Sequence, residues 1–322
     1  MITLSLLAAS AAMTQAAPVE LGRVFTKGES LTYKVRSNLT AESRGLQLRT
    51  WMPEDLDINY DFTMDVEEMK TDGIAVIRYK RPTMTIIEGE TSEEPAKTNK
   101  EKSNFDLRLT LSPINEILDV KDLYKPPVKK KASLRVPNTL AAQGSVIGQF
   151  VSEMYRLSLF AGSFDSALDF APKLRNTKVA VGDTWQKTVG YQPQKMKGKS
   201  GKSVVQRLDF TYTYKGPVTV NGKKFQRVEA TYDLDTDLSE FINDTFEVKE
   251  SDTGIKKLPL RMKSKVQFNL DPVTHHCVLA EAETEGGYEV FASDFDNALF
   301  ETRLKGRTMM QLASRKVAPV KK

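Results

Sequence analysis

The chain has 322 residues, of which 40% are hydrophobic and 28% are charged, and its net charge is +5. This is an ordinary globular composition with enough apolar residues for a sizeable core. The mild excess of positive charge favours anionic surfaces in general and selects no particular partner. The single cysteine, Cys277, excludes an internal disulfide, so we expect the fold to depend on its core.

Residues 1–17 predict export. The stretch from Met1 to Met13 is apolar and has no charged side chain, and Thr14-Gln15-Ala16 and Gln15-Ala16-Ala17 place small residues at cleavage spacing. This pattern is typical of a secretory signal peptide, although its first residues include no Lys or Arg. A buried N-terminal helix is the alternative. No later stretch reaches the ~18 apolar residues of a membrane helix, so we expect a periplasmic or extracellular protein without a transmembrane segment.

Alternating apolar residues predict antiparallel strands in the first half of the chain, 18–136. The clearest strand is at 55–66, where the apolar residues share one face: Leu56, Ile58, Tyr60, Phe62, Met64 and Val66. Such alternation indicates a strand with one buried face. Residues 37–54 suggest a polar loop or a weak strand, and residues 88–104 suggest a charged loop.

The second half, 171–313, matches the first at four points in the same order. The pairs are Lys27–Leu31 with Val181–Trp185, Asp61–Met64 with Asp209–Tyr212, Asp72-Gly73 with Asn221-Gly222, and Leu111–Ile114 with Leu270–Val273. We therefore predict a diverged internal duplication of a β-meander. The alternative is that any two antiparallel meanders share such turn residues.

The middle of the chain, 137–170, is the one long segment with a helical pattern. Asn138-Thr139 offers an N-cap, and apolar residues then recur at three- and four-residue steps: Ile147, Phe150, Val151, Met154 and Leu157. The predicted fold is therefore mainly β, of the α+β class, with two similar antiparallel meanders forming a curved sheet around a central helix. Its parts are a signal peptide (1–17), a first meander (18–136), the helical segment (137–170), a second meander (171–313) and a disordered basic tail (314–322).

The most reactive-looking triplet is His275-His276-Cys277, which includes both histidines of the chain. Adjacent strand residues point to opposite faces, so neighbours do not easily share one metal ion. The triplet also follows the Asp271-Pro272 turn, where polar residues are expected. We therefore expect a turn followed by a buried strand cysteine, with no metal site and no nucleophile.

Two further motifs fail on detail. Asp233, Asp235 and Asp237 resemble the start of a calcium loop, but Leu238 stands where such a loop needs glycine. Gly201-Lys202-Ser203 lacks the upstream glycine spacing of a phosphate loop. We therefore expect no cofactor and no catalysis, although a glycosidase that uses two carboxylates is left open.

Basic residues concentrate in Lys121–Arg135, in Lys195–Lys202 and at the C-terminus. These segments are candidates for contact with lipid head groups or an anionic envelope polymer, and solvated loops are the alternative. Aromatic residues are not interleaved with them, so we expect no specific binding of nucleic acid.

The turn Val181-Gly182-Asp183-Thr184-Trp185 resembles one in uncharacterised bacterial exported β-rich proteins, where a Gly-Asp-Thr-Trp turn opens a second meander. In those proteins a Ser-Pro-x-Asn/Gly-Glu turn, as in Ser112–Glu116, closes the first meander. The resemblance covers most of the mature chain and implies a location and a sheet-and-helix shape, not an activity. The expected architecture is also similar to bacterial lipoprotein carriers and lipid-binding half-barrels.

From these patterns we predict an exported, non-catalytic binding protein that holds a lipid or other apolar ligand between sheet and helix. The predicted ligand-binding residues are Phe150, Met154, Leu157 and Phe160. A dry, filled core is the alternative explanation of this apolar bulk. The alternative function is a structural or surface-interaction protein of the cell envelope that uses its basic loops.

Overall fold

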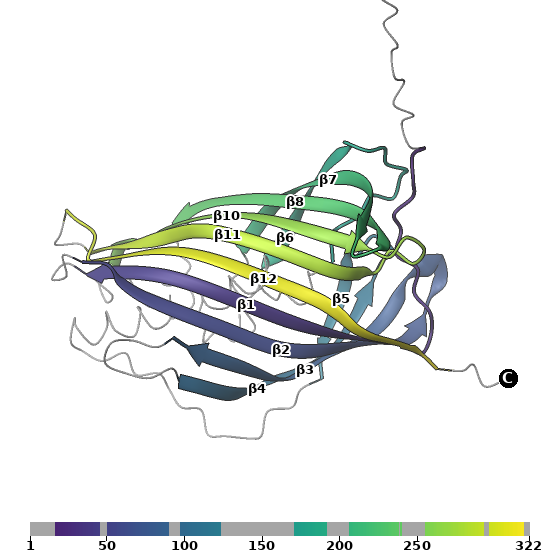
Figure 1. The fold of residues 1–322 in the computed structure, drawn as a ribbon, viewed down its shortest axis with the longest axis horizontal. Helices are drawn as coiled ribbons and strands as arrows, with labels where there is room; N and C mark the ends of the chain where they lie inside the picture. The colour runs from purple at the N-terminus through teal and green to yellow at the C-terminus, as the bar shows by residue number, and fades with distance from the viewer. Residues whose placement is uncertain are drawn as a thin grey trace, which may run out of the picture.

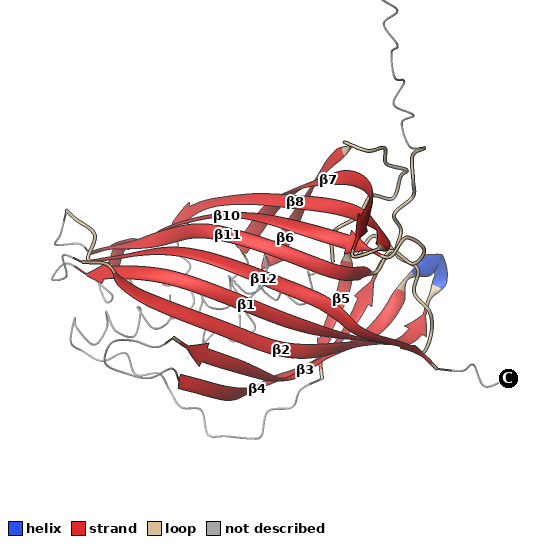
Figure 2. Cartoon of the chain, in the orientation of Figure 1, coloured by secondary structure: helices blue, strands red, loops and turns tan. Residues whose placement is uncertain are grey.

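A computed structural model describes residues 17–45, 50–89, 97–123, 171–191, 206–237, 239, 255–292 and 296–318, and nearly all of them belong to one antiparallel sheet of twelve strands (Figures 1 and 2). The strands are β1 (Glu29–Gly45), β2 (Met52–Met69), β3 (Ala75–Glu88), β4 (Lys97–Leu111), β5 (Ile117–Asp122), β6 (Thr184–Tyr191), β7 (Gln206–Val220), β8 (Lys223–Asp237), β9 (Ile255–Lys257), β10 (Pro259–Leu270), β11 (Cys277–Ala292) and β12 (Phe300–Val317).

The two ends of the described chain meet in the middle of the sheet. The strand order is β5-β4-β3-β2-β1-β12-β11-β10-β8-β7-β6, with β9 paired to β11. The chain therefore starts at the centre, steps outward to β5, resumes at the opposite edge with β6, and steps back to the centre at β12. The ladder between β1 and β12 runs from Glu29↔Val317 to Gly45↔Phe300 and joins the two halves along their full length.

The prediction of an α+β fold organised around a central helix is wrong. The described residues form a single β-sheet, and the only helical element whose full extent they include is the 3-10 turn η1 (Thr71–Gly73). The two meanders join through the β1–β12 ladder, so strand pairing organises the fold. Residues 137–170, where the helix was predicted, lie outside the described residues. Across the described part of the chain, no helix is both long enough and apolar enough to span a membrane.

The strand predictions fare better. The alternating stretch 55–66 lies within β2, and its apolar residues are buried, with Ile58 and Phe62 each 1% exposed. Three segments extend the strands, although the pattern suggested a loop or weak strand for the first, a charged loop for the second and a disordered tail for the third. Residues 37–45 complete β1, residues 97–104 begin β4, and β12 continues to Val317.

One face of the sheet is apolar and the other polar. Along β1, Leu31, Tyr33 and Val35 are buried, whereas Lys34 and Arg36, which alternate with them, are exposed. The same alternation in the other long strands gives one continuous buried cluster. Sheets of this size curl, and Figure 1 shows the edge strands β5 and β6 behind the central strands. We call the two sides the apolar face and the polar face.

At one end of the sheet, side chains tie the two edges together. The Asn115 Nδ2 atom donates to the carbonyl oxygen of Pro172 (2.9 Å), and the Lys173 Nζ atom donates to the carbonyl oxygen of Asn115 (2.9 Å). The Trp185 Nε1 atom of β6 donates to the carbonyl oxygen of Lys173 (2.7 Å). These bonds connect β6 with the turn that precedes β5, although the two edge strands share no ladder.

The N-terminal segment 17–28 crosses the same end. Val19 forms an isolated bridge with Val179. The backbone N–H of Arg23 donates to Pro113, and that of Val24 donates to Thr274. We call this the closed end; it comprises residues 17–28, 112–116, 171–183 and 271–276. β5 pairs only with Leu107–Leu111 of β4, next to the closed end, and at the opposite, open end no backbone hydrogen bond between described residues joins β4 to β6.

Candidate functional site

An aromatic cluster covers the apolar face in the first half of the sheet. The ring of Phe62 stacks on Tyr33 with a centroid distance of 4.9 Å, and it lies 5.2 Å from Tyr79 and 6.4 Å from Tyr60. These residues come from β1, β2 and β3, and all four are buried. Aromatic side chains bury large areas with defined geometry, so this cluster is a rigid wall of the apolar face.

A second aromatic cluster covers the corresponding part of the second half. Trp185 stacks on Tyr212 at 5.7 Å, and Phe210 lies 5.8 Å from Tyr212 and 4.9 Å from Tyr232. These residues come from β6, β7 and β8. The two aromatic clusters therefore stand on opposite sides of the three central strands β12, β11 and β10.

A row of small side chains crosses the strands between the two aromatic clusters, and it ends next to Ile58 of β2 on one side and Tyr212 of β7 on the other. Ser37 faces Thr308, Thr308 faces Ala282, Ala282 faces Val266, and Val266 faces Ala230, in one row across β1, β12, β11, β10 and β8. We call these five residues the central row. All are buried, and the Ser37 and Thr308 hydroxyls bond each other at 2.6 Å. Because most of its side chains are short, this row lets a covering group approach the sheet backbone closely.

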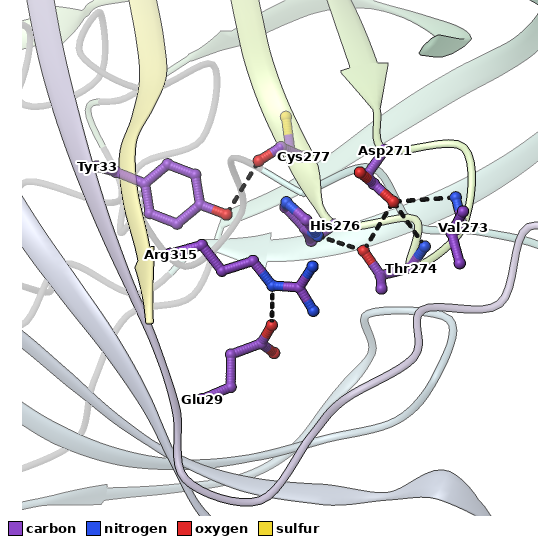
Figure 3. A network of polar contacts seen from close by, with 8 residues as sticks. All are labelled: Glu29, Tyr33, Asp271, Val273, Thr274, His276, Cys277 and Arg315. Carbon is purple, nitrogen blue, oxygen red and sulfur yellow. Dashed lines mark hydrogen bonds and ion pairs between the residues drawn. The ribbon is translucent and has the colours of Figure 1, made fainter. Parts of the chain in front are cut away.

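A polar cluster lies at the closed end of the apolar face (Figure 3). The Arg315 Nε atom binds the Glu29 Oε1 atom at 2.6 Å, and the Tyr33 hydroxyl donates to the carbonyl oxygen of Cys277 at 2.9 Å. The His276 Nδ1 atom contacts the Thr274 hydroxyl. Glu29, Tyr33, His276 and Cys277 are all less than 5% exposed. The group joins β1, β11 and β12 at the end of the sheet.

Burial sets the protonation states in this cluster. It raises the pKa of the Cys277 thiol to about 12 and also raises the pKa of Tyr33. Burial and, to a smaller extent, the nearby charge of Arg23 lower the pKa of His276 to about 4. At neutral pH these three groups are uncharged. A buried protonated thiol is a poor nucleophile, and the predicted turn with a buried strand cysteine is confirmed by Cys277 and by His275, whose φ is 55°.

Protonation of His276 gives a testable pH dependence. Its pKa is 6.5 when unperturbed and about 4 in the fold. Between these values the unfolded chain binds a proton that the folded chain does not, so stability is full above pH 6.5 and falls as the pH drops towards 4.

We expect wild type to lose on the order of 2 kcal/mol more than His276→Gln between pH 7 and pH 4.5. Urea unfolding of both proteins at both pH values measures the difference. Carboxylates that both proteins share, such as Asp271, contribute equally to the two losses, so their effect cancels in the comparison. Parallel losses in the two proteins would show that His276 is not held neutral by the fold.

The polar face has hollows lined by charged side chains. One of about 930 Å³ is lined by residues of β1, β7, β8, β10, β11 and β12, including Asp233, Lys263 and Arg307. Lys263 pairs with Asp233, and Arg261 pairs with Asp235, each at 3.5 Å, with the side chains about two-thirds exposed or more. Such exposed pairs contribute little, so the hollow reads as a solvated sheet face.

A smaller hollow of about 260 Å³ lies near the open end. The Trp51 ring there lies 4.6 Å from the guanidinium of Arg44 and 4.2 Å from that of Arg303. Arg44 is also bound through two nitrogens to Glu301. Both guanidiniums are already engaged with Trp51 or Glu301, so this hollow is not our candidate site.

The three aspartates weighed as a calcium loop do not converge. Asp233 and Asp235 lie in the cross-strand pairs above, and Asp237 accepts backbone N–H groups of Ser239 and Leu258. Within the described ranges, no three His, Cys, Asp or Glu side chains come together as a metal site would require. Asp233 and Asp235 therefore belong to the solvated face.

The predicted ligand-binding residues Phe150, Met154, Leu157 and Phe160 lie outside the described residues, as do Lys129–Lys131 and Lys195–Lys202. Sequence analysis missed the central row and the closed-end cluster. The period-two pattern gave the face of each strand residue, but only the strand order brings Ser37, Ala282 and Thr308 together.

Comparison with known proteins adds weak likenesses of shape. No protein-family model matches the chain, and no curated protein sequence matches it. Among solved structures, lipovitellin, from a study of its lipid–protein interactions, has 12% identity and a TM-score of 0.41 over 92% of this chain. This chain spans only 26% of the length of that lipovitellin chain.

Two other solved structures match at lower scores. DynF from the dynemicin biosynthesis pathway of Micromonospora chersina has 8% identity and a TM-score of 0.23, covering 98% of this chain and 94% of that one. OccAB3 of Acinetobacter baumannii has 7% identity and a TM-score of 0.26, covering 89% and 99%. Scores this low carry no argument about function.

Proposed function

We propose that this chain is an exported, non-catalytic binding protein whose apolar sheet face holds a lipid or another apolar ligand. The observation that carries the proposal is the shape of that face, where the short side chains of the central row cross the strands that separate two aromatic clusters. Ligand sites are mostly apolar with a few placed polar groups. A long apolar molecule lying along the central strands fits this arrangement.

The closed and open ends support the same proposal. The closed end is tied by hydrogen bonds from Asn115, Lys173 and Trp185, whereas no backbone hydrogen bond between described residues joins β4 to β6 at the open end. A sheet that is fastened at one end and unpaired at the other can admit a ligand without unfolding its ladders. Export is supported by the apolar run of residues 1–17, most of which lies outside the described residues.

Matching hydrogen bonds support the proposal that residues 18–136 and 171–313 derive from one duplicated meander. The N–H of Gly28 donates to Val66 (2.9 Å), and the N–H of Gly182 donates to Tyr214 (2.8 Å). Both glycines have positive φ, 78° and 94°, which glycine adopts at little cost. A pair of equivalent halves accounts for an aromatic cluster on each side of the central row.

The competing explanation is a dry core in which protein side chains fill all the space over the central row. Replacing Ala282 with tryptophan separates the two, because Ala282 is 3% exposed in that row. If a ligand occupies the space, the tryptophan ring fills it in place of the ligand. The affinity for a fluorescent acyl-chain probe then falls at least tenfold, and the protein stays folded. Overpacking of a filled core instead costs about 1–3 kcal/mol or more.

Glu283→Trp is the matched control, because Glu283 is the next residue of β11 and lies exposed on the polar face. We expect it to leave probe binding and the melting temperature unchanged. Unfolding of Ala282→Trp, together with no probe binding by wild type, would contradict the proposal and favour the filled core.

The second candidate function was a structural or surface-interaction protein that holds anionic envelope polymer. Its basic segments, Lys129–Lys131 and Lys195–Lys202, lie outside the described residues. On the described polar face, cations such as Lys263 and Arg261 face acids on the neighbouring strand. This balance of charge gives no specific support to a polyanion partner.

A further inference from the structure

Arg23 is a buried cation whose side chain is only partly satisfied. It is 5% exposed, and its guanidinium lies 4.5 Å from the centroid of the Phe25 ring. Its Nε and Nη2 atoms are closed to solvent and have no hydrogen-bond partner. Buried guanidinium nitrogens are normally bonded, because an unmet donor or an unpaired charge in the interior is costly.

The surrounding groups do not supply the missing anion. Glu29 is the buried carboxylate of the closed-end cluster, and it is bound to Arg315 at 2.6 Å. Tyr33, His276 and Cys277 are uncharged at neutral pH, for the reasons given above. The Asp271 carboxylate is engaged by the N–H groups of its own turn. Two guanidiniums therefore share one buried carboxylate, which leaves one positive charge in excess.

The excess positive charge of Arg23 lies near one end of the apolar face. Arg23 lies close enough to Tyr33 and Glu29 to interact with both electrostatically, and Tyr33 begins the first aromatic cluster by stacking on Phe62. Ser37 of the central row lies four residues farther along β1, roughly 13 Å at the rise of a strand. A molecule with its charged head at Arg23 would lay its chain beside the first aromatic cluster and towards the central row.

We infer that the apolar ligand is anionic, a chain with a carboxylate head that Arg23 binds at the closed end. This inference rests on the proposed function and names the chemical class of its ligand. Arg23 supplies two free N–H donors, Nε and Nη2, to the head. Guanidinium–carboxylate bonds through two nitrogens are the strong, directional form of this contact.

The test compares dodecanoate with dodecan-1-ol by isothermal titration calorimetry on the full-length protein, freed of bound lipid on a hydrophobic resin. The two probes share the same chain and differ only in the charge of the head. We expect dodecanoate to bind wild type at least tenfold more tightly. In Arg23→Met, which retains a chain to cover Phe25, we expect dodecanoate to fall to the affinity of the alcohol.

The control variant is Arg36→Met, because Arg36 is a half-exposed arginine on the polar face of β1 that pairs with Asp61 at 3.5 Å. We expect it to bind both probes as wild type does. A second readout is the melting temperature without ligand. A buried arginine that is left unpaired until a ligand binds destabilises the ligand-free protein. We therefore expect Arg23→Met to melt at the wild-type temperature or above it.

The outcomes separate this inference from the function beneath it. Equal binding of the acid and the alcohol by wild type overturns the anionic head and leaves an apolar ligand standing. Binding of neither probe overturns both proposals. A lower melting temperature for ligand-free Arg23→Met assigns Arg23 a structural role and overturns the inference. The comparison of dodecanoate with dodecan-1-ol on the wild-type protein does not depend on whether this variant folds.

Discussion

Phe62→Ala is expected to lower the free energy of unfolding by about 3–5 kcal/mol, the usual cost of removing a buried phenylalanine ring. Phe62 is 1% exposed and contacts the rings of Tyr33, Tyr60 and Tyr79. Its loss removes apolar burial and also the central ring of the first aromatic cluster. Urea denaturation followed by circular dichroism measures the change.

Asp61→Ala is the matched control. Asp61 is the neighbouring residue of β2, and its side chain is 54% exposed on the polar face, where it pairs with Arg36 at 3.5 Å. Exposed ion pairs contribute about 0–1 kcal/mol, so we expect little change. Equal losses in the two variants would show that the two faces of β2 are not distinguished as described.

Gly286→Ala is expected to lower the free energy of unfolding by about 3 kcal/mol, at the upper end for overpacking. A Cβ atom at Gly286 would lie 2.2 Å from the carbonyl oxygen of Arg261 and 2.9 Å from the Cα atom of Met262. Both are backbone atoms of β10, so no side-chain rotation relieves the clash. The β10–β11 ladder must open locally.

The same substitution at Gly45 tests the reason for this effect. A Cβ atom there would meet its nearest neighbour, the carbonyl oxygen of Leu299, at 3.6 Å, which is ordinary contact. We expect Gly45→Ala to change the free energy of unfolding by less than about 1 kcal/mol. A stable Gly286→Ala, measured by the same urea titration, would show that β10 and β11 do not approach as closely as described.

Local pattern predicted the strands where one face is strictly apolar. The stretch 55–66 in β2 is the clearest case, because every second residue is large and buried. The pattern left 37–45 undecided between a loop and a weak strand, because the buried face of β1 there includes Ser37 and Ala41. Ser37 is buried because Thr308 satisfies its hydroxyl from β12, and period alone does not reveal a partner so distant in the sequence.

The position of β12 at the centre of the sheet was not predicted. The sequence placed residues 300–313 in the second meander and 314–322 in a disordered tail, whereas β12 runs to Val317 and pairs with β1 along its length. Its place beside β1 depends on long-range pairing between the two ends of the chain. The closed-end cluster was also beyond local pattern, because Arg23, Tyr33 and Arg315 meet only through that pairing.

The central claim is that the apolar face holds an apolar ligand, and native mass spectrometry of protein purified without detergent tests it most directly. The account predicts a second population of the mature chain, heavier by the mass of one lipid-like molecule. Organic extraction should remove this added mass. The heavier population should be absent from Ala282→Trp and present in Glu283→Trp. A single ligand-free mass for wild type, with no uptake of added dodecanoate or dodecan-1-ol, would contradict the account.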